Sequence, residues 1–296
     1  MEAQEFRGVF TALVTPFNIK GEVDEEGLRE VTRFQIENGV NGLFVCGSTG
    51  EGPLMATDQR KFVAERVIDE VSNRITVIVH VGSTNTEEAV KLAKHAEDVG
   101  ADAVGAITPY YYKPDLEGLY DYYRLISESV EIPVFIYNMP TVTGFNVTPD
   151  MVAKICTLPN VIGIKDSGRN LIQVREIIET VPRKIVVING SDNLAFPALM
   201  IGAYGQISGN ANAAPELFVE LYRHFRNGDY AKALEFQEKI NRLIRVFEGF
   251  PPIAPIKAAM ELRGIRAGLP KSPLRPLRPE ETEALKLRLS KLNLYW

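Results

Sequence analysis

The sequence predicts an α/β fold, a (β/α)8 or TIM barrel with a C-terminal helical extension. Eight short apolar runs alternate with amphipathic segments, which is the order of elements in such a barrel. The apolar runs are nearly continuous, as in parallel strands that are covered on both faces. The chain has 296 residues, which could form two average domains, but α/β barrels run to about 250 residues as a single domain.

The eight strands are predicted from runs rich in β-branched and other apolar residues. An open, doubly wound sheet is the main alternative for units of this kind. No GxGxxG turn follows the first run, which disfavours this alternative without excluding it. The predicted strands cover residues 9–16, 42–47, 76–82, 103–109, 133–140, 161–165, 185–190 and 205–210.

The helices between these strands are predicted from apolar residues that recur at intervals of three and four, with charged residues opposite. Thr86 and Thr148 stand where helix caps are expected, and Gly39 and Gly100 stand where helices end. The predicted barrel helices cover residues 24–38, 57–72, 87–101, 115–130, 148–157, 170–181 and 193–202.

Four further helices are predicted beyond the eighth strand, at residues 214–226, 229–247, 253–263 and 279–291. We therefore expect a barrel core in residues 1–213, followed by the last barrel helix and a C-terminal helical region in residues 214–296. The stretch PKSPLRPLRP (270–279) is rich in proline and basic residues. We interpret it as a stiff surface connection, with a peptide motif for a partner as the alternative.

Composition narrows the possible partners and locations. The net charge of −5 argues against a nucleic-acid partner, because proteins that bind nucleic acids carry a basic face. No apolar stretch is long enough to cross a bilayer, and the segment MEAQEFRGVF lacks the features of a signal peptide. The two cysteines provide no disulfide framework, so a cytoplasmic location is expected. The three histidines show no metal-ligand spacing, and no metal site is predicted.

Polar residues gather where the predicted strands end, which is the edge that carries the active site in (β/α)8 barrels. The sixth strand, VIGIK, ends with Lys165. Lysine is rarely buried unless its charge is paired. Lys165 is therefore either a structural lysine whose amine reaches water at a strand end, or an uncharged nucleophile. A neutral amine can attack a carbonyl substrate and form a Schiff base.

Neighbouring residues could support such a reaction. Tyr137 closes the adjacent fifth strand, and its phenol could move protons at the amine. Ser48 or Thr49 of GSTGEG could extend the proton path, and the backbone N–H groups of this loop suit a small carboxylate. Strand alternation should direct Asp166 away from the amine, into the barrel wall or the helix layer. A half-buried structural tyrosine and a common glycine-rich turn are the alternative interpretations.

The segments GSTGEG, PYYY, YNMPTVTG and IGIKDSG together resemble the signatures of the dihydrodipicolinate synthase and N-acetylneuraminate lyase family. The resemblance runs from Phe6 to the C-terminal helices. It implies a (β/α)8 barrel and a class I aldolase or lyase in which Lys165 forms a Schiff base with pyruvate or another 2-oxo acid. It also implies that the enzyme uses no metal and no organic cofactor. Members of the family are commonly homotetramers, built as dimers of dimers.

The resemblance also implies roles for individual residues. Tyr137 and Ser48 would relay protons, Thr49 would bind the substrate carboxylate, and Ile207 would contact pyruvate. Tyr111 would reach the site of a neighbouring subunit. The full set of expected catalytic residues is Lys165, Tyr137, Ser48 and Tyr111. The expected substrate-binding residues are Thr49, Ser167, Gly190, Asp192 and Ile207.

The substrate is less clearly indicated than the family. Val142 stands where dihydrodipicolinate synthases carry the arginine that binds the second substrate, and Asn193 stands where N-acetylneuraminate lyases carry a glutamate. The GSD triplet and the YNxPTxTG loop are most similar to 2-keto-3-deoxy-sugar-acid aldolases. The leading hypothesis is therefore an aldolase of the 2-keto-3-deoxygluconate type, with Ser167 and Asp192 contacting substrate hydroxyls.

Several alternatives stay open at this point. The closest are dihydrodipicolinate synthesis from pyruvate and aspartate semialdehyde, and N-acetylneuraminate cleavage. A non-catalytic sensor of 2-oxo acids would keep the pocket without turnover. An enzyme that uses the amine only as a base on a phosphorylated substrate would form no Schiff base.

Overall fold

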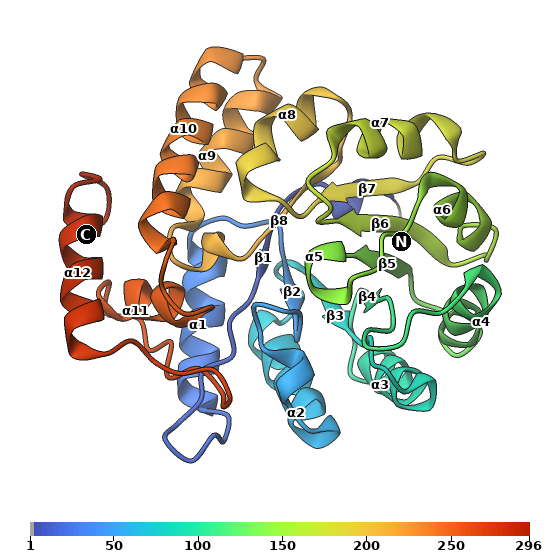
Figure 1. Cartoon of the computed structure of the whole chain (residues 1–296), viewed down its shortest axis with the longest axis horizontal. Helices are drawn as coiled ribbons and strands as arrows, with labels where there is room; N and C mark the ends of the chain where they lie inside the picture. The colour runs from blue at the N-terminus through green and yellow to red at the C-terminus, as the bar shows by residue number, and fades with distance from the viewer. Residues whose placement is uncertain (1–2) are drawn as a thin grey trace.

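The computed structural model describes residues 3–296, and over these residues eight parallel strands form one closed barrel, in chain order (Figure 1). The predicted fold class is therefore confirmed. Each strand falls within its predicted run, except that β1 begins one residue earlier, at Gly8, and β6 continues by one residue to Asp166. The strands are β1 (Gly8–Ala12), β2 (Gly42–Val45), β3 (Thr76–His80), β4 (Ala103–Ile107), β5 (Val134–Asn138), β6 (Val161–Asp166), β7 (Val186–Asn189) and β8 (Gly205–Ser208).

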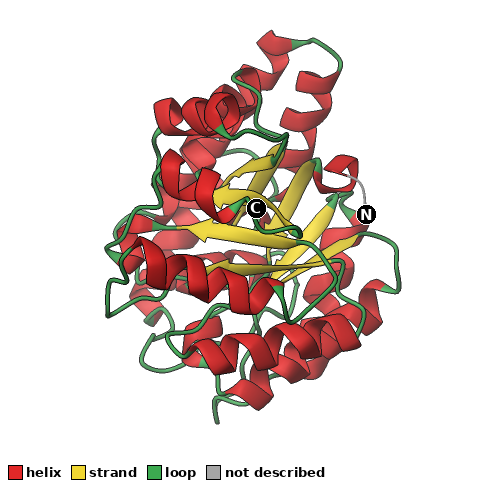
Figure 2. Cartoon of the chain, turned by 90° about the vertical axis from the view of Figure 1, so that its right-hand side faces the viewer, coloured by secondary structure: helices red, strands yellow, loops and turns green. Residues whose placement is uncertain are grey.

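Helices surround the barrel, and Figure 2 shows from the side how they enclose the strands. All predicted helices are present with ends that shift by a few residues. The barrel helices are α1 (Glu25–Glu37), α2 (Thr57–Val71), α3 (Thr86–Asp98), α4 (Leu116–Ser127), α6 (Pro149–Ile155), α7 (Leu171–Thr180), α8 (Ala195–Met200) and α9 (Pro215–Arg226). Short 3₁₀ helices lie at Ala3–Phe6, Gly52–Leu54, Asp192–Leu194 and Asn210–Asn212.

Two local predictions about β5 and α3 need correction. A one-turn helix, α5 (Pro140–Thr143), follows β5, where the strand was expected to continue to residue 140. Proline suits the first position of a helix because it has no N–H to donate. The N-cap of α3 is Asn85 rather than Thr86, since the Asn85 side chain accepts a hydrogen bond from the backbone of Glu88. Thr148 caps α6 as predicted.

The C-terminal region lies outside the ring of barrel helices. It consists of α10 (Tyr230–Phe247), α11 (Ala254–Glu261) and α12 (Pro279–Ser290). Helix α10 packs against α9, and α12 contacts both α10 and α11, as the orange and red segments of Figure 1 show. The division of the chain at residues 213 and 214 into two units stays a prediction. The proline-rich stretch connects α11 to α12, and its Leu274 lines a cavity, so it does more than bridge two helices at the surface.

Aromatic side chains fill the interior of the barrel below its mouth. Phe6, Phe10, Phe44 and Phe135 are buried in one cluster with small and aliphatic residues from the strands. Glycines on the neighbouring strands make room for these rings: a Cβ on Gly42 would lie 2.2 Å from the Phe10 ring. Since a packed interior admits no water, the barrel is open to ligands only at its mouth.

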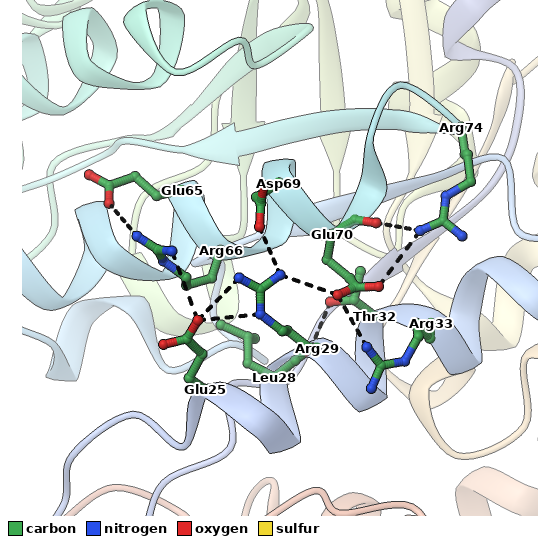
Figure 3. Close-up of polar contacts among 10 residues, drawn as sticks. All are labelled: Glu25, Leu28, Arg29, Thr32, Arg33, Glu65, Arg66, Asp69, Glu70 and Arg74. Carbon is green, nitrogen blue, oxygen red and sulfur yellow. Dashed lines mark hydrogen bonds and ion pairs between the residues drawn. The ribbon is translucent and has the colours of Figure 1, made fainter.

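Helices α1 and α2 are joined by a network of ion pairs at the surface (Figure 3). The guanidinium of Arg29 lies 3.1 Å from Glu25, 2.8 Å from Asp69 and 3.3 Å from Glu70. Glu70 also pairs with Arg33 at 3.2 Å. Networks of this kind stabilise more than isolated surface pairs do. The network fixes α2, which follows the GSTGEG segment, relative to α1.

Two further findings concern residues 3–296. No helix in this range has the length and apolar character needed to cross a membrane. No group of three or more histidine, cysteine or acidic side chains in the same range is arranged to hold a metal ion.

Candidate active site

Lys165 and Tyr137 lie side by side at the mouth of the barrel. The pairing of β5 with β6 places them at the same register position. The Lys165 Nζ atom lies 4.0 Å from the centre of the Tyr137 ring and 4.2 Å from the centre of the Phe44 ring. Lys165 is 4% exposed, and no described residue forms a hydrogen bond or ion pair with its amine. The amine is thus held at the mouth by packing against two aromatic rings rather than by an ion pair.

Asp166 points away from this amine, as strand alternation predicts. Its carboxylate accepts hydrogen bonds from Asn138 Nδ2 at 3.0 Å, Gln173 Nε2 at 2.9 Å and the backbone N–H of Gly168 at 2.7 Å. The carboxylate therefore links β5, β6 and α7 behind the barrel wall. It holds the segment after Lys165 without neutralising the amine.

The Tyr137 hydroxyl has two polar neighbours. It lies 3.3 Å from the Ser48 hydroxyl, within hydrogen-bond distance, and it donates a hydrogen bond to the sulfur of Met139 at 2.9 Å. Ser48 also donates to this sulfur at 3.5 Å. Sequence reasoning missed Met139, although its place directly after β5 puts it at the mouth. The phenol and the serine form a short path for a proton beside the lysine.

A buried ion pair supports the GSTGEG segment from behind. The carboxylate of Glu51 accepts a hydrogen bond from Lys257 Nζ at 2.6 Å and from the backbone N–H of Lys271 at 2.6 Å. The Lys257 ammonium also donates to the carbonyls of Thr15 and Leu269, each at 2.7 Å. All three N–H donors of an ammonium are thereby used. Sequence reasoning missed this pair because its members are 206 residues apart.

The pKa values of this pair follow from its burial. Loss of solvent raises the pKa of Glu51, while the positive charge of Lys257 opposes that rise. Burial lowers the pKa of Lys257 to about 8, with Glu51 opposing the change. Each partner thus opposes the effect of burial on the pKa of the other. The C-terminal region thus contributes directly to the segment that carries Ser48 and Thr49.

His80 packs against Tyr137 inside the barrel, with the ring centres 5.8 Å apart and the rings nearly perpendicular. Its Nδ1 lies 3.0 Å from the carbonyl of Cys46, and its Nε2 accepts a hydrogen bond from the backbone of Ile107 at 3.3 Å. Burial, reinforced by the charge of Arg60, lowers the pKa of His80 well below its usual value. The neutral ring therefore donates from Nδ1 and fixes one face of Tyr137.

Two cavities adjoin this centre, and we name them by their linings. The polar cavity, of about 240 Å³, is lined by residues that include Thr49, Met139, Ser167, Gly190 and Asp192. Ile244 of α10 and Ile256 of α11 also line this cavity. The apolar cavity, of about 230 Å³, is lined by residues that include Ser48, Ile107, Tyr110, Val142 and Leu274.

The polar cavity brings four of the five expected substrate-binding residues together. A Cβ on Gly190 would lie 2.0 Å from Ser167 Oγ and 3.2 Å from Lys165 Cε, so this glycine allows the lysine and serine to approach. The Asp192 carboxylate already accepts hydrogen bonds from Gln206 at 2.7 Å and Ser208 at 2.9 Å.

Burial raises the pKa of Asp192, and these hydrogen bonds oppose the rise.

Two expected residues lie apart from the cavities. Ile207 is buried in the aromatic cluster inside the barrel, below the mouth. Tyr111 is 86% exposed, has a left-handed φ of 78°, and contacts the ring of Tyr112 edge-on. Within one chain, Tyr111 is therefore not part of the centre formed by Lys165 and Tyr137.

The site thus combines the amine of Lys165, the phenol of Tyr137 and the hydroxyl of Ser48. A comparison of the sequence with known protein families agrees with this arrangement. The model of the dihydrodipicolinate synthetase family matches residues 5–292. The chain belongs to this family. Members of this family are class I, Schiff-base aldolases that act on pyruvate, and this chain is accordingly a carbon–carbon lyase.

Individual family members are similar over nearly the whole chain. A 4-hydroxy-tetrahydrodipicolinate synthase from Methanopyrus kandleri is 40% identical over 294 residues, which covers 98% of this chain and 97% of the relative. One from Methanocaldococcus jannaschii is 41% identical over 291 residues, covering 98% and 99%. The solved structure of YagE from E. coli K12, a family member in complex with pyruvate, has a TM-score of 0.94 and 33% identity, covering 98% and 99%.

These names favour dihydrodipicolinate synthesis, an alternative in the sequence analysis, over the leading hypothesis of a 2-keto-3-deoxygluconate-type aldolase.

Proposed function

We propose that this family member condenses pyruvate with L-aspartate 4-semialdehyde, as a 4-hydroxy-tetrahydrodipicolinate synthase. The observation that carries the reaction type is the buried Lys165 amine, which lies against two aromatic rings and has no anionic partner among the described residues. The names of relatives with about 40% identity over nearly the whole chain support the choice of aldehyde.

The proposed reaction begins with the Lys165 amine. Its Nζ adds to C2 of pyruvate, water leaves, and an iminium forms. The iminium accepts the electron pair that C3 keeps when it loses a proton, which gives an enamine. The enamine carbon attacks the aldehyde carbon of the second substrate and forms the new C–C bond. The amine of that substrate then attacks C2, closes the ring and releases Lys165.

The surrounding residues move protons and bind substrate in this proposal. Tyr137 and Ser48 form the proton path, since their oxygens are 3.3 Å apart. Thr49, Ser167 and Gly190 adjoin the pyruvate carboxylate, and Ile207 supports the site from below. In the proposed homotetramer, the exposed Tyr111 reaches the site of a neighbouring subunit.

A 2-keto-3-deoxy-sugar-acid aldolase is the second candidate. It is favoured by Val142, which lines the apolar cavity and offers no charge to a carboxylate. Hydroxyl and amide side chains in the polar cavity also suit a sugar chain.

Product analysis separates the two candidates. Purified enzyme is incubated with pyruvate and either aspartate semialdehyde or glyceraldehyde, and products are identified by mass spectrometry. We expect faster turnover of aspartate semialdehyde. Turnover of glyceraldehyde alone would contradict the proposal and support the second candidate. A sensor would bind pyruvate without turning over either aldehyde, and an enzyme that uses the amine only as a base would form no pyruvate adduct.

A further inference from the structure

Arg169 lies four residues after Lys165 and lines the polar cavity together with Ser167 and Gly190. Ser167 and Gly190 adjoin the lysine, because a Cβ on Gly190 would lie 3.2 Å from Lys165 Cε. Substrate that extends from the lysine into this cavity therefore meets Arg169. Among the described residues that line the polar and apolar cavities, Arg169 is the only basic one.

The charge of Arg169 has no partner within residues 3–296. No hydrogen bond or ion pair joins its guanidinium to another described residue, whereas Arg175, on α7, lies 2.7 Å from Glu179. The acid that shares the cavity, Asp192, is engaged by Gln206 and Ser208. The guanidinium is thus free to bind an anion from the cavity.

The backbone holds Arg169 in a conformation that favours glycine. Its φ is +57°, in the left-handed region. The residues on both sides are anchored: the N–H of Gly168 donates to Asp166 at 2.7 Å, and the side chain of Asn170 caps α7. An unfavourable backbone conformation that is fixed from both sides is typical of ligand-binding positions.

We propose that Arg169 binds the carboxylate of the aldehyde substrate and so selects anionic aldehydes over neutral ones. The inference rests on the proposed function and specifies how its second substrate is recognised. A guanidinium offers a planar pair of N–H donors that matches a carboxylate. Val142 cannot supply this contact from the apolar cavity, so Arg169 provides the charge that the site otherwise lacks.

The test compares two aldehydes of equal chain length, succinic semialdehyde and butanal, which differ in the carboxylate, with pyruvate as the co-substrate. Aspartate semialdehyde is measured in parallel. The variants are Arg169→Gln, Arg169→Lys and Arg169→Gly. Glycine adopts the left-handed φ of this position without strain, so a loss of activity in Arg169→Gly does not result from a backbone that no longer folds correctly. Arg175→Gln is the matched control, since it removes an exposed arginine from the adjacent helix. Borohydride trapping of pyruvate checks that each variant still forms the Schiff base.

We expect Arg169→Gln and Arg169→Gly to lower kcat/KM for the anionic aldehydes by about 10- to 100-fold, as for loss of a charged hydrogen bond. The loss should appear mainly in KM, with Arg169→Lys intermediate. Butanal kinetics, pyruvate trapping and the Arg175→Gln control should stay unchanged. Equal losses for butanal and succinic semialdehyde, or no loss for either, would overturn the inference. If the wild type rejects aspartate semialdehyde but uses succinic semialdehyde through Arg169, the inference holds and the proposed function fails.

Discussion

Removing Lys257 should destabilise the protein more than removing any surface lysine. The Lys257→Met variant leaves the Glu51 carboxylate buried, because the side chains of Lys257 and Glu51 are 1% and 0% exposed. It also removes the donor to two carbonyls, those of the buried Thr15 and of Leu269. Loss of one partner from a buried ion pair costs about 3–5 kcal/mol. We expect a decrease of this size in the free energy of unfolding.

Urea denaturation at neutral pH measures this decrease. The matched control is Lys286→Met, since Lys286 pairs with Glu283 at the surface, with side chains 45% and 71% exposed. Its effect should be below about 1 kcal/mol. The double variant Lys257→Met/Glu51→Gln should recover part of the loss, because it leaves no buried charge. A Lys257→Met loss no larger than that of the control would refute the reasoning.

Three further predictions concern residues around Lys165. Tyr137→Phe should lower kcat by about 100-fold or more through loss of proton transfer; unchanged steady-state kinetics would exclude the phenol from the reaction. Gly190→Ala should slow pyruvate trapping, since its Cβ would lie 2.0 Å from Ser167 Oγ; wild-type trapping rates would show that this side chain can move freely. His80 has a lowered pKa when folded, so the unfolded state binds more protons below pH 6.5 and stability falls with acid. The wild type should therefore lose more stability than His80→Asn between pH 7 and 5 in urea titrations; identical pH profiles would contradict a neutral buried ring.

The barrel could be predicted because each strand carries its own signal. Buried parallel strands are apolar along their whole length, so a run such as residues 76–82 identifies a strand without knowledge of its neighbours. Chain order then places adjacent strands together, which is why Tyr137 and Lys165 could be expected to meet. The direction of Asp166 followed from strand alternation alone.

The contacts that support the site could not be predicted in this way. Glu51 and Lys257 belong to distant parts of the chain, and the local sequence around each residue does not predict that the two are in contact. Arg169 resembles an ordinary loop residue in the sequence, and only its left-handed φ and its place at the cavity distinguish it. The sequence predicts Thr86 as the cap of α3, whereas the side chain of Asn85 accepts the capping hydrogen bond, a choice that depends on side-chain geometry.

The most direct test of the account is chemical trapping at Lys165. The protein is incubated with pyruvate, reduced with borohydride and digested, and the peptides are analysed by mass spectrometry. We predict the mass of a reduced pyruvate adduct on Lys165, and neither adduct nor aldol turnover in Lys165→Ala. An unmodified Lys165, or a Lys165→Ala variant with wild-type activity, would contradict the assignment of this amine as the nucleophile.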